Sequence, residues 1–309
     1  MKTGLVIKAT GSQYTVRLDG GVQVVCGLKG RLRTEGVKST SPVVVGDRVA
    51  AEAGTQGEWL IAGVEPRRNY LIRKATNLSR QSHIIAANVD RAFLTVTLRM
   101  PETPTEFIDR FLASAEAYSI PVCLVFNKTD LYADAERDAM MQLIDVYRAV
   151  GYTVVETSVV NDTGIHIIKG MMEGRISVLA GLSGTGKSSL VRAVNPDLAV
   201  RVGDMSAYHR SGKHTTTFAE MLDTGNGGYI IDTPGIRGFG LINIEREELY
   251  HFFPEIFKAA AACSFHNCLH INEPGCAVVK AVAEGGSVNA GRYRNYLSMM
   301  SDDSQKKYR

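Results

Sequence analysis

The chain has 309 residues, of which 45 % are hydrophobic and 22 % are charged, as in an ordinary globular protein of two or three domains. No apolar run approaches the roughly 18 residues of a membrane span, and the amino-terminal segment lacks the apolar length of a signal peptide. We therefore expect a cytoplasmic protein that has no membrane partner and keeps its cysteines reduced.

The formal net charge of +3 is unevenly distributed along the chain. Residues 1–80 contain 13 Lys and Arg against 6 Asp and Glu, whereas the remaining residues contain 22 against 26. A basic first part on an acidic body favours a polyanionic partner for that part. An incidental bias of a solvated surface is the alternative.

Residues 1–72 alternate short β-rich runs with glycine-containing turns. The expected strands are residues 4–9, 13–18, 22–27, 47–53 and 58–64. Five short strands in about 70 residues predict a small closed barrel, for which an OB-fold fits best. OB barrels bind nucleic acids through basic and aromatic groups. The candidate RNA-binding residues are Arg31, Arg33, Arg67 and Arg68.

From residue 73 the pattern changes to alternating strands and helices, which predicts a mainly parallel sheet with helices on both faces. Thr103-Pro104-Thr105-Glu106 is a capping box that opens a helix ending near Tyr118. The other expected elements are strands 90–97, 121–126, 152–156, 175–180 and 228–231 and a helix over 134–149. After residue 239 the chain becomes helical. The expected helices there are 245–253, 275–283 and 292–300.

A glycine-rich loop follows the apolar run 176–180 and leads into a helix. This strand, loop and helix order is typical of a Walker A phosphate loop, whose backbone N–H groups face phosphate oxygens. Lys187 is expected to reach the β- and γ-phosphates, and the Ser188 hydroxyl is expected to bind Mg²⁺. The expected nucleotide-binding residues are Gly181, Leu182, Ser183, Gly184, Thr185, Gly186, Lys187, Ser188 and Ser189.

Asn127-Lys128-Thr129-Asp130 follows the apolar run 122–126, so it lies at the carboxyl end of a strand, where open α/β sheets bind ligands. The Asp130 carboxylate can accept hydrogen bonds from the ring N1–H and the exocyclic amine of guanine, whereas adenine presents an acceptor at N1. The Lys128 stem can lie over the base, and Asn127 can tie this loop to the phosphate loop. Alone, the four residues could form a plain turn; beside a phosphate loop they predict GTP binding.

The apolar run 228–231 ends in Asp232, which is the Walker B arrangement. Asp232 is expected to hold Mg²⁺, and the Gly235 N–H is expected to meet the γ-phosphate. A polar loop at 211–217 lies where a first switch should be. Thr216 is the favoured residue in it to complete the Mg²⁺ shell.

The order of the motifs is unusual, because the base clamp at 127–130 precedes the phosphate loop at 181–188. In most GTPases the phosphate loop comes first. All the GTPase motifs are present, but their order along the chain is shifted cyclically, which predicts a circularly permuted GTPase. Thr157 and Ser158, after strand 152–156, fit a second base-contacting loop, although a simple strand end fits nearly as well.

Three of the five cysteines cluster with a histidine near the end of the chain. The cluster consists of Cys263, Cys268, His270 and Cys276. Three thiolates and one imidazole within 14 residues match a tetrahedral structural Zn²⁺ site, and the odd number of cysteines disfavours disulfides. His266 is the alternative fourth ligand. The remaining cysteines lie in apolar runs and are expected in the core: Cys26 and Cys123.

These features, with His214-Thr215-Thr216-Thr217 in the first switch, resemble the RsgA (YjeQ) family over essentially the whole chain. The resemblance implies an OB-fold RNA-binding domain at 1–72, a circularly permuted GTPase domain at 73–238 and a helical zinc-binding subdomain at 239–309. It also implies a late assembly factor of the small ribosomal subunit, with barrel contacts to rRNA and GTP hydrolysis to GDP and phosphate stimulated by the subunit. Off the ribosome we expect a monomer.

Ras-type enzymes place a water-orienting glutamine directly after the glycine of the second switch. Here that residue is Ile236, which cannot orient water. His214 in the first switch is the candidate for this role, as the resemblance also implies, and a surface histidine is the alternative. The expected catalytic residues are therefore His214, Lys187 and Thr216. Two other functions stay open: an RNA-binding scaffold with GTP as a structural ligand, and a permuted GTPase that acts on the large subunit or another RNA.

Overall fold

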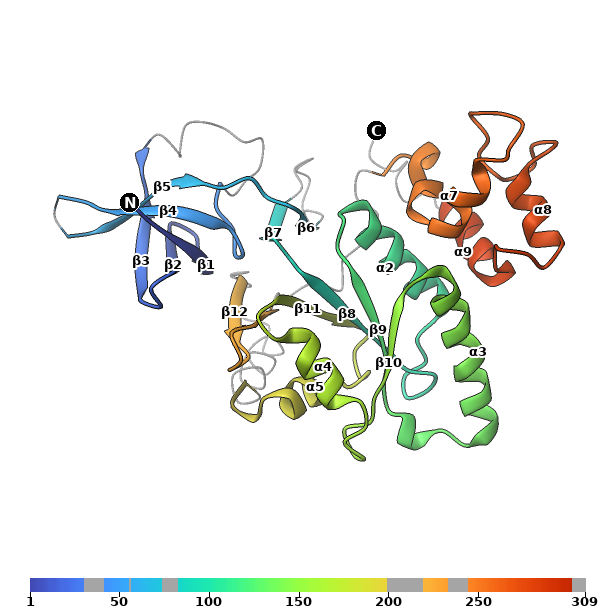
Figure 1. Ribbon diagram of the computed structural model, residues 1–309, viewed down its shortest axis with the longest axis horizontal. Coiled ribbons are helices and arrows are strands. Elements are labelled where there is room, and N and C mark those ends of the chain that lie inside the picture. The colour runs from blue at the N-terminus through green and yellow to red at the C-terminus, as the bar shows by residue number, and fades with distance from the viewer. Residues whose placement is uncertain (31–41, 56, 74–82, 199–218, 233–243, 302–309) are drawn as a thin grey trace.

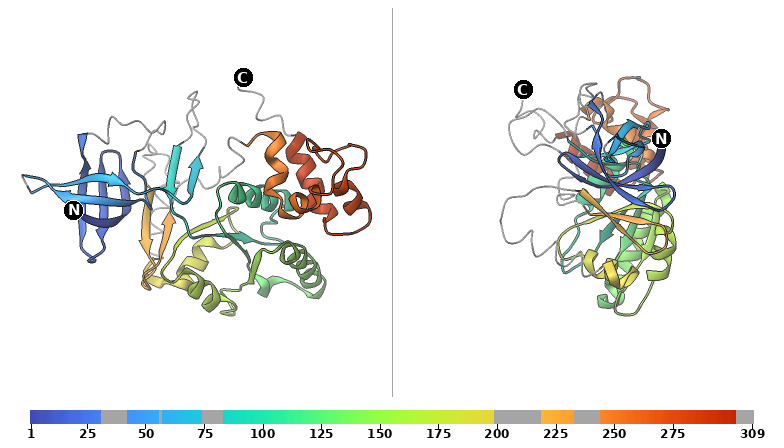
Figure 2. Two further views of the ribbon diagram at one scale, coloured as in Figure 1. Left: turned by 45° about the horizontal axis from the view of Figure 1, so that its top comes forward. Right: turned by 90° about the vertical axis from the view of Figure 1, so that its left-hand side faces the viewer.

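The computed structural model describes residues 1–30, 42–55, 57–73, 83–198, 219–232 and 244–301 (Figure 1). A small barrel and a helical subdomain lie at opposite ends of the molecule, with an α/β sheet between them (Figure 2). None of the helices in these ranges has both the length and the apolar character needed to cross a membrane.

The described strands of the first part close into a barrel, as the sequence predicts. They are β1 (Lys2–Thr10), β2 (Gln13–Leu18), β3 (Gln23–Leu28), β4 (Arg48–Ala53) and β5 (Trp59–Val64). β1 pairs with β2 and β4, β2 pairs with β3, and β5 joins β3 to β4, so the ring is complete. Side chains along β2 alternate between buried and half-buried, and Tyr14, Val16 and Leu18 fill the barrel with Cys26. The barrel is therefore a packed core with a closed, OB-like strand order.

The central sheet has the order β10-β9-β8-β11-β13, and every pair in it is parallel. Its strands are β8 (Arg91–Val96), β9 (Val122–Phe126), β10 (Thr153–Glu156), β11 (Ile176–Gly181) and β13 (Tyr229–Asp232). All residues of β9 are buried, including Cys123, because helices cover both faces of the sheet. The covering helices are α2 (Thr105–Ala117), α3 (Asp134–Val150), α4 (Ile165–Met172) and α5 (Lys187–Val194).

The sheet also contains a strand in addition to those predicted from the sequence. β12 (Ala219–Asp223) runs antiparallel to β13 on one side and to β1 of the barrel on the other. The barrel thereby continues the central sheet. Lys8 of β1 forms an ion pair with Glu220 at 3.0 Å, and Arg17 of β2 donates to both Asp223 at 2.8 Å and the Tyr229 hydroxyl at 2.6 Å.

A second contact fixes the barrel beside a hairpin formed by β6 (Tyr70–Arg73) and β7 (His83–Ala87). Gly46 has a φ of 92°, and a Cβ there would lie 2.0 Å from the Ala87 carbonyl oxygen, so only glycine fits. The Asn88 amide donates to the Gly46 carbonyl at 2.9 Å. The hairpin spans the predicted domain boundary at residue 72.

The last part packs η3 (Arg246–Phe252), α7 (Pro254–Ala260), α8 (Ala277–Ala283) and α9 (Ala290–Ser301) around their own core. The helix predicted over 245–253 is a 3-10 helix instead, and α7 was not predicted. Pro254 explains the break, because proline excludes the preceding residue from the α conformation, and Phe253 has φ −118° and ψ 93°.

Candidate nucleotide and metal sites

The base clamp and the phosphate loop meet through Asn127, although they lie more than 50 residues apart in the sequence. The Asn127 amide donates to the Thr185 carbonyl at 2.9 Å, and its side-chain oxygen accepts from the Thr157 hydroxyl at 2.9 Å. Both partners are fully buried. Asn127 therefore joins three loops at the carboxyl edge of the sheet, where such folds bind ligands.

Lys128 and Asp130 also have defined positions. Lys128 adopts a left-handed φ of 65°, and its ammonium donates to the Gly184 carbonyl at 2.7 Å and to the Met100 carbonyl. Asp130 lies in η1 (Thr129–Leu131), and its carboxylate accepts from the Ser158 hydroxyl at 2.5 Å. The structure thus brings the two predicted base-contacting loops together, and Ser158 orients the carboxylate that would read guanine.

The glycines of the phosphate loop permit this close assembly. Gly186, directly before α5, has a φ of 94°, and a Cβ there would lie 2.3 Å from the Asn127 amide nitrogen. Gly181 has a φ of 137°, and its Cβ would lie 2.7 Å from the Thr95 carbonyl oxygen. Any other residue at these two positions would push the base clamp or β8 away from the phosphate loop.

Lys187 and Ser188 begin α5 beside the loop. The Lys187 ammonium donates to the Gly181 carbonyl at 2.9 Å and to the Leu182 carbonyl at 2.5 Å, so it lies over the loop's own backbone. The Ser188 residue is exposed at the first turn of the helix. β13 ends at Asp232 parallel to β11, so the Walker B strand ends on the same edge of the sheet.

Several predicted site residues lie outside the described part of the chain. They are Arg31, Arg33, His214, Thr216 and Gly235, together with Ile236. Ser183, Gly184 and Ser189 lie on the described phosphate loop and its helix. The Thr129 hydroxyl donates to the Thr157 carbonyl at 3.2 Å.

The cysteine cluster is assembled in the helical subdomain. The four ligand atoms of Cys263, Cys268, His270 and Cys276 lie within 4.8 Å of one another, whereas His266 is exposed. The His270 Nδ1 lies 3.5 Å from the Cys263 sulfur and 3.6 Å from the Cys276 sulfur, and these two sulfurs lie 3.9 Å apart. A tetrahedral ion with Zn–S of about 2.3 Å and Zn–N of about 2.0 Å separates its ligand atoms by roughly 3.5–3.8 Å. The donor set and its spacing therefore fit Zn²⁺.

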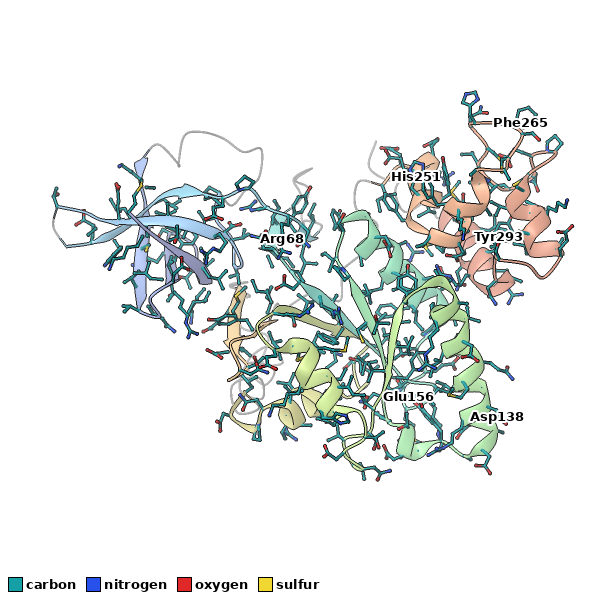
Figure 3. All side chains as sticks on the ribbon, in the orientation of Figure 1. Arg68, Asp138, Glu156, His251, Phe265 and Tyr293 are labelled. Atoms are coloured by element: carbon teal, nitrogen blue, oxygen red, sulfur yellow. The ribbon has the colours of Figure 1, made fainter. Side chains whose placement is uncertain are left out.

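Neighbouring groups hold the ligand loop in this shape. The Glu273 carboxylate accepts from the backbone N–H groups of Leu269 at 2.8 Å and Ile271 at 2.9 Å. Burial opposes its ionisation, but these hydrogen bonds hold the pKa of Glu273 at about 2. From α9, Tyr293 donates to the His270 carbonyl at 2.7 Å and Tyr296 to the Leu269 carbonyl at 2.8 Å (Figure 3). Burial raises the pKa of the Cys268 thiol to about 12, so a thiolate there needs a bound cation.

Of the four arginines predicted to bind RNA, the structure describes Arg67 and Arg68, which have different environments. The Arg67 side chain is only 14 % exposed and makes a bidentate pair with the buried Asp47, at 2.7 Å for both bonds. Arg67 therefore holds the segment before β4 through Asp47 and the Pro42 carbonyl, and its part in RNA binding stays a prediction. The Arg68 side chain is 64 % exposed and pairs with Asp90 at 2.7 Å, at the surface between barrel and sheet (Figure 3).

Two supporting groups were missed in the sequence. The Tyr132 hydroxyl donates to the Asn127 carbonyl at 2.9 Å and accepts from the Leu98 N–H at 3.0 Å. The segment after β8 thereby reaches the site, where the Met100 carbonyl binds Lys128. Neither residue belongs to a recognised nucleotide motif, so only the fold reveals them.

Comparisons with known proteins identify the family. The RsgA N-terminal domain matches residues 3–61, and the RsgA GTPase domain matches residues 64–242. The protein named small ribosomal subunit biogenesis GTPase RsgA from Bacteroides fragilis (strain YCH46) is 50 % identical over 306 residues, which cover 99 % of this chain and 98 % of that protein. The protein of the same name from Porphyromonas gingivalis (strain ATCC BAA-308 / W83) is 47 % identical over 311 residues, 99 % of this chain and 98 % of that protein.

Solved structures give the same result for the fold. YjeQ from Thermotoga maritima matches with a TM-score of 0.81 and 36 % identity, covering 97 % of each chain. YloQ, described as a circularly permuted GTPase, matches with a TM-score of 0.77 and 28 % identity, covering 100 % of this chain and 97 % of the other. The chain therefore belongs to the RsgA family of circularly permuted GTPases, which are hydrolases acting on GTP.

Proposed function

We propose that this GTPase is Mg²⁺-dependent, binds the small ribosomal subunit during its late maturation, and leaves after hydrolysing GTP to GDP and phosphate. The observation that carries the nucleotide part is the contact of Asn127 with Thr185, because it joins the guanine clamp to the phosphate loop. The name shared by the relatives, small ribosomal subunit biogenesis GTPase, supports the choice of partner.

Within this proposal, the Asp130 carboxylate reads the base and the Lys187 ammonium leaves its loop carbonyls to meet the β- and γ-phosphates. Ser188, Thr216 and Asp232 hold Mg²⁺, which neutralises charge on the phosphates when it is bound. The exposed position of Ser188 at the start of α5 supports its part in this set.

His214 takes the place of the missing glutamine in the hydrolysis step. It orients water or stabilises charge in the transition state without necessarily removing a proton. Because this arrangement depends on a single switch residue, intrinsic turnover is slow and rises when the small subunit binds.

The chain has three parts with different functions, which comprise residues 1–72, 73–238 and 239–309. The barrel, with its excess of basic residues, docks on rRNA, the central part hydrolyses GTP, and the last part holds one structural Zn²⁺. The protein acts in the cytoplasm as a monomer off the ribosome.

A second function is kept open by Ile236, since a residue that cannot orient water is compatible with a scaffold that binds GTP without turnover. The deciding experiment measures GTP hydrolysis with no addition, with purified small subunits and with purified large subunits. Stimulation by small subunits alone supports the proposal. Equal hydrolysis rates under all three conditions, with GTP bound to the protein, support the scaffold function. Stimulation by large subunits alone would identify the large subunit as the partner.

A further inference from the structure

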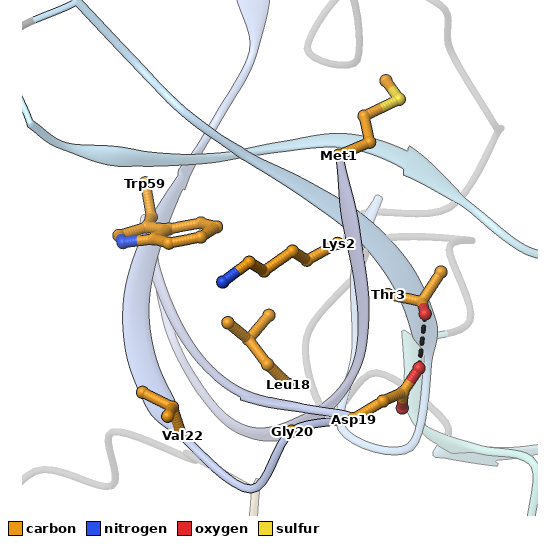
Figure 4. A pocket seen from close by; sticks show the side chains of 8 residues that line it. All are labelled: Met1, Lys2, Thr3, Leu18, Asp19, Gly20, Val22 and Trp59. Atoms are coloured by element: carbon orange, nitrogen blue, oxygen red, sulfur yellow. Dashed lines mark hydrogen bonds between the residues drawn. The ribbon is translucent and has the colours of Figure 1, made fainter.

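The outer end of the barrel carries a pocket of about 460 Å³ (Figure 4). Trp59, the only tryptophan of the chain, forms one wall, and Leu18 and Val22 contribute further apolar surface. Lys2 lies at the far end of β1 from Lys8, which pairs with the central sheet, and six residues of strand span roughly 20 Å. The pocket therefore lies at the surface of the barrel, beyond the part of β1 that pairs with β12.

The Lys2 side chain occupies the space beside the indole. Its ammonium lies 5.8 Å from the ring centroid of Trp59, and Figure 4 shows the extended side chain between the indole and Leu18. An exposed cation–π contact at this distance is weak, and the lysine stem is flexible. A flat ligand can therefore displace it and leave the ammonium at the mouth of the pocket.

The rim presents little free negative charge. Asp19 lines the pocket, but its carboxylate accepts two hydrogen bonds from Arg48, at 2.8 and 3.0 Å, and one from the Thr3 hydroxyl. Val22 is 61 % exposed, so an apolar surface stays uncovered beside the cation. An aromatic face next to a mobile cation is the arrangement that binds a base and its phosphate in single-stranded nucleic acids.

We propose that this pocket takes one unpaired RNA base, which stacks on Trp59 while Lys2 moves aside to contact the adjoining phosphate. The inference rests on the proposed docking of the barrel on rRNA, and it names where a base is received. The basic excess of residues 1–80 favours RNA over an aromatic side chain of a protein partner.

Because Trp59 is the only tryptophan, its emission reports directly on the pocket in the full-length protein. Titration with a short single-stranded RNA should quench or shift this emission in a saturable way. Inorganic polyphosphate supplies charge without bases and should leave it unchanged, and free tryptophan amide corrects for absorption by the RNA. A peptide rich in phenylalanine and tyrosine is the third ligand, and it should have no effect.

Substitutions test the same pocket by the anisotropy of labelled RNA. Trp59→Ala should weaken binding roughly 5- to 150-fold, as the loss of one base–aromatic stack does, and Trp59→Phe should weaken it less. Lys2→Met should lower the salt dependence of binding. Val25→Ala, on the neighbouring strand and 59 % exposed, is the matched control and should bind as the wild type. Unchanged intrinsic GTP hydrolysis verifies that each variant is folded.

The outcomes separate this inference from the proposed function. RNA binding without a change in Trp59 emission, or quenching by polyphosphate or by the peptide, overturns the pocket assignment, as does an absence of RNA binding. If wild-type protein still pellets with small subunits in those cases, the docking proposal survives. Failure of the wild type to pellet with small subunits overturns the docking proposal whatever the fluorescence shows.

Discussion

At the scale of single residues, Asp130 has the geometry of a base-reading group. Its carboxylate is fixed by Ser158, and the Asn127 amide holds the surrounding loop against the phosphate loop. Asp130→Asn should lower GTP affinity roughly 10- to 100-fold, because a charged hydrogen-bonding pair contributes about 1.5–3 kcal/mol. It should improve xanthosine triphosphate binding, since an amide can donate to the xanthine oxygen.

A competition assay between the two nucleotides checks this. Ser158→Ala is the control, because it loosens the carboxylate without changing its hydrogen-bonding character and should weaken GTP without favouring xanthosine triphosphate. If Asp130→Asn keeps the selectivity of the wild type, Asp130 does not read the base.

His214 should separate binding from hydrolysis. His214→Ala should leave GDP affinity nearly intact and slow subunit-stimulated hydrolysis by about 10²-fold, the effect of removing one transition-state donor. Single-turnover hydrolysis with purified small subunits measures this, with His266→Ala as a control for a general loss of histidine. Turnover at the wild-type rate would assign the role to another side chain or to a ribosomal group.

The choice between two histidines can also be tested at the metal site. His270 is buried against two cysteine sulfurs, whereas His266 is exposed. His270→Ala should lose most of the roughly one Zn²⁺ per chain, and His266→Ala should keep it. Metal analysis after gel filtration, with Cys276→Ala as a positive control for loss, gives the result. Full zinc content in His270→Ala would mean that another group completes the site.

At the scale of elements, α9 is attached to α2 of the GTPase domain by one buried cation. Arg292 is 2 % exposed and pairs with Glu255 of α7, at 2.5 and 3.1 Å, and with Asp109 of α2. Asn295 adds a hydrogen bond to Asp109 at 2.6 Å. The zinc-binding subdomain is therefore held on α2, whose preceding segment supplies Met100 to the nucleotide site.

Arg292→Met should destabilise the fold by about 3–5 kcal/mol near pH 8, because it leaves two buried carboxylates without their cation. The loss should be smaller near pH 5, where the carboxylates can take up protons. Urea unfolding at the two pH values measures it, and the exposed Arg294→Met is the matched control. An equal loss at both pH values would show that packing of the long side chain, and not charge, is what matters.

The stability of the wild-type protein also depends on pH through Asp109. Burial raises the pKa of Asp109 to about 6, although Arg292 lowers it. The folded protein therefore binds the proton of the Asp109 carboxyl group more tightly than the unfolded chain does. The contribution of Asp109 to stability is therefore greatest below about pH 4 and is lost as the pH rises toward 6.

The elements differ in how much of them could be predicted. The phosphate loop, the base clamp and the cysteine cluster depend on short motifs, and the parallel strands depend on apolar runs; all of these could be read locally. Arg292 could not, because a charged residue on a helix usually faces solvent, and its partners lie 37 and 183 residues away. β12 pairs with β13 across a short turn that contains Gly225 and Gly227, so this hairpin could have been predicted locally; its pairing with β1, far away in the sequence, could not.

At the scale of the whole molecule, the barrel and the GTPase domain share structure. Their joint consists of β1 beside β12, Gly46 against Ala87, and the ion pair of Lys8 with Glu220. The basic composition of residues 1–80 predicts a polyanionic partner for this part of the chain, but not how this part is attached to the rest. The joint makes the barrel an extension of the central sheet. This could not be predicted, because strand pairing between segments so distant leaves no local signal in the sequence.

This joint decides the expected result of removing residues 1–72. Ile7, Val45 and Leu71 are buried in the same apolar core as the central sheet and α2. Truncating one buried side chain of this size costs about 2–5 kcal/mol, and a whole domain is stable by only about 5–15 kcal/mol. The deletion also leaves β12 as an unpaired edge, which favours aggregation. The truncated chain should therefore unfold at a much lower urea concentration, associate as measured by light scattering, and lose GTP affinity, although its nucleotide motifs are intact.

Replacing both Lys8 and Arg17 by alanine in the full chain is the control. The exposed ion pairs of these two residues contribute about 1 kcal/mol or less each, so the urea midpoint should fall only slightly. A truncated protein that stays monomeric, with the midpoint and GTP affinity of the full chain, would show that the barrel is an independent module.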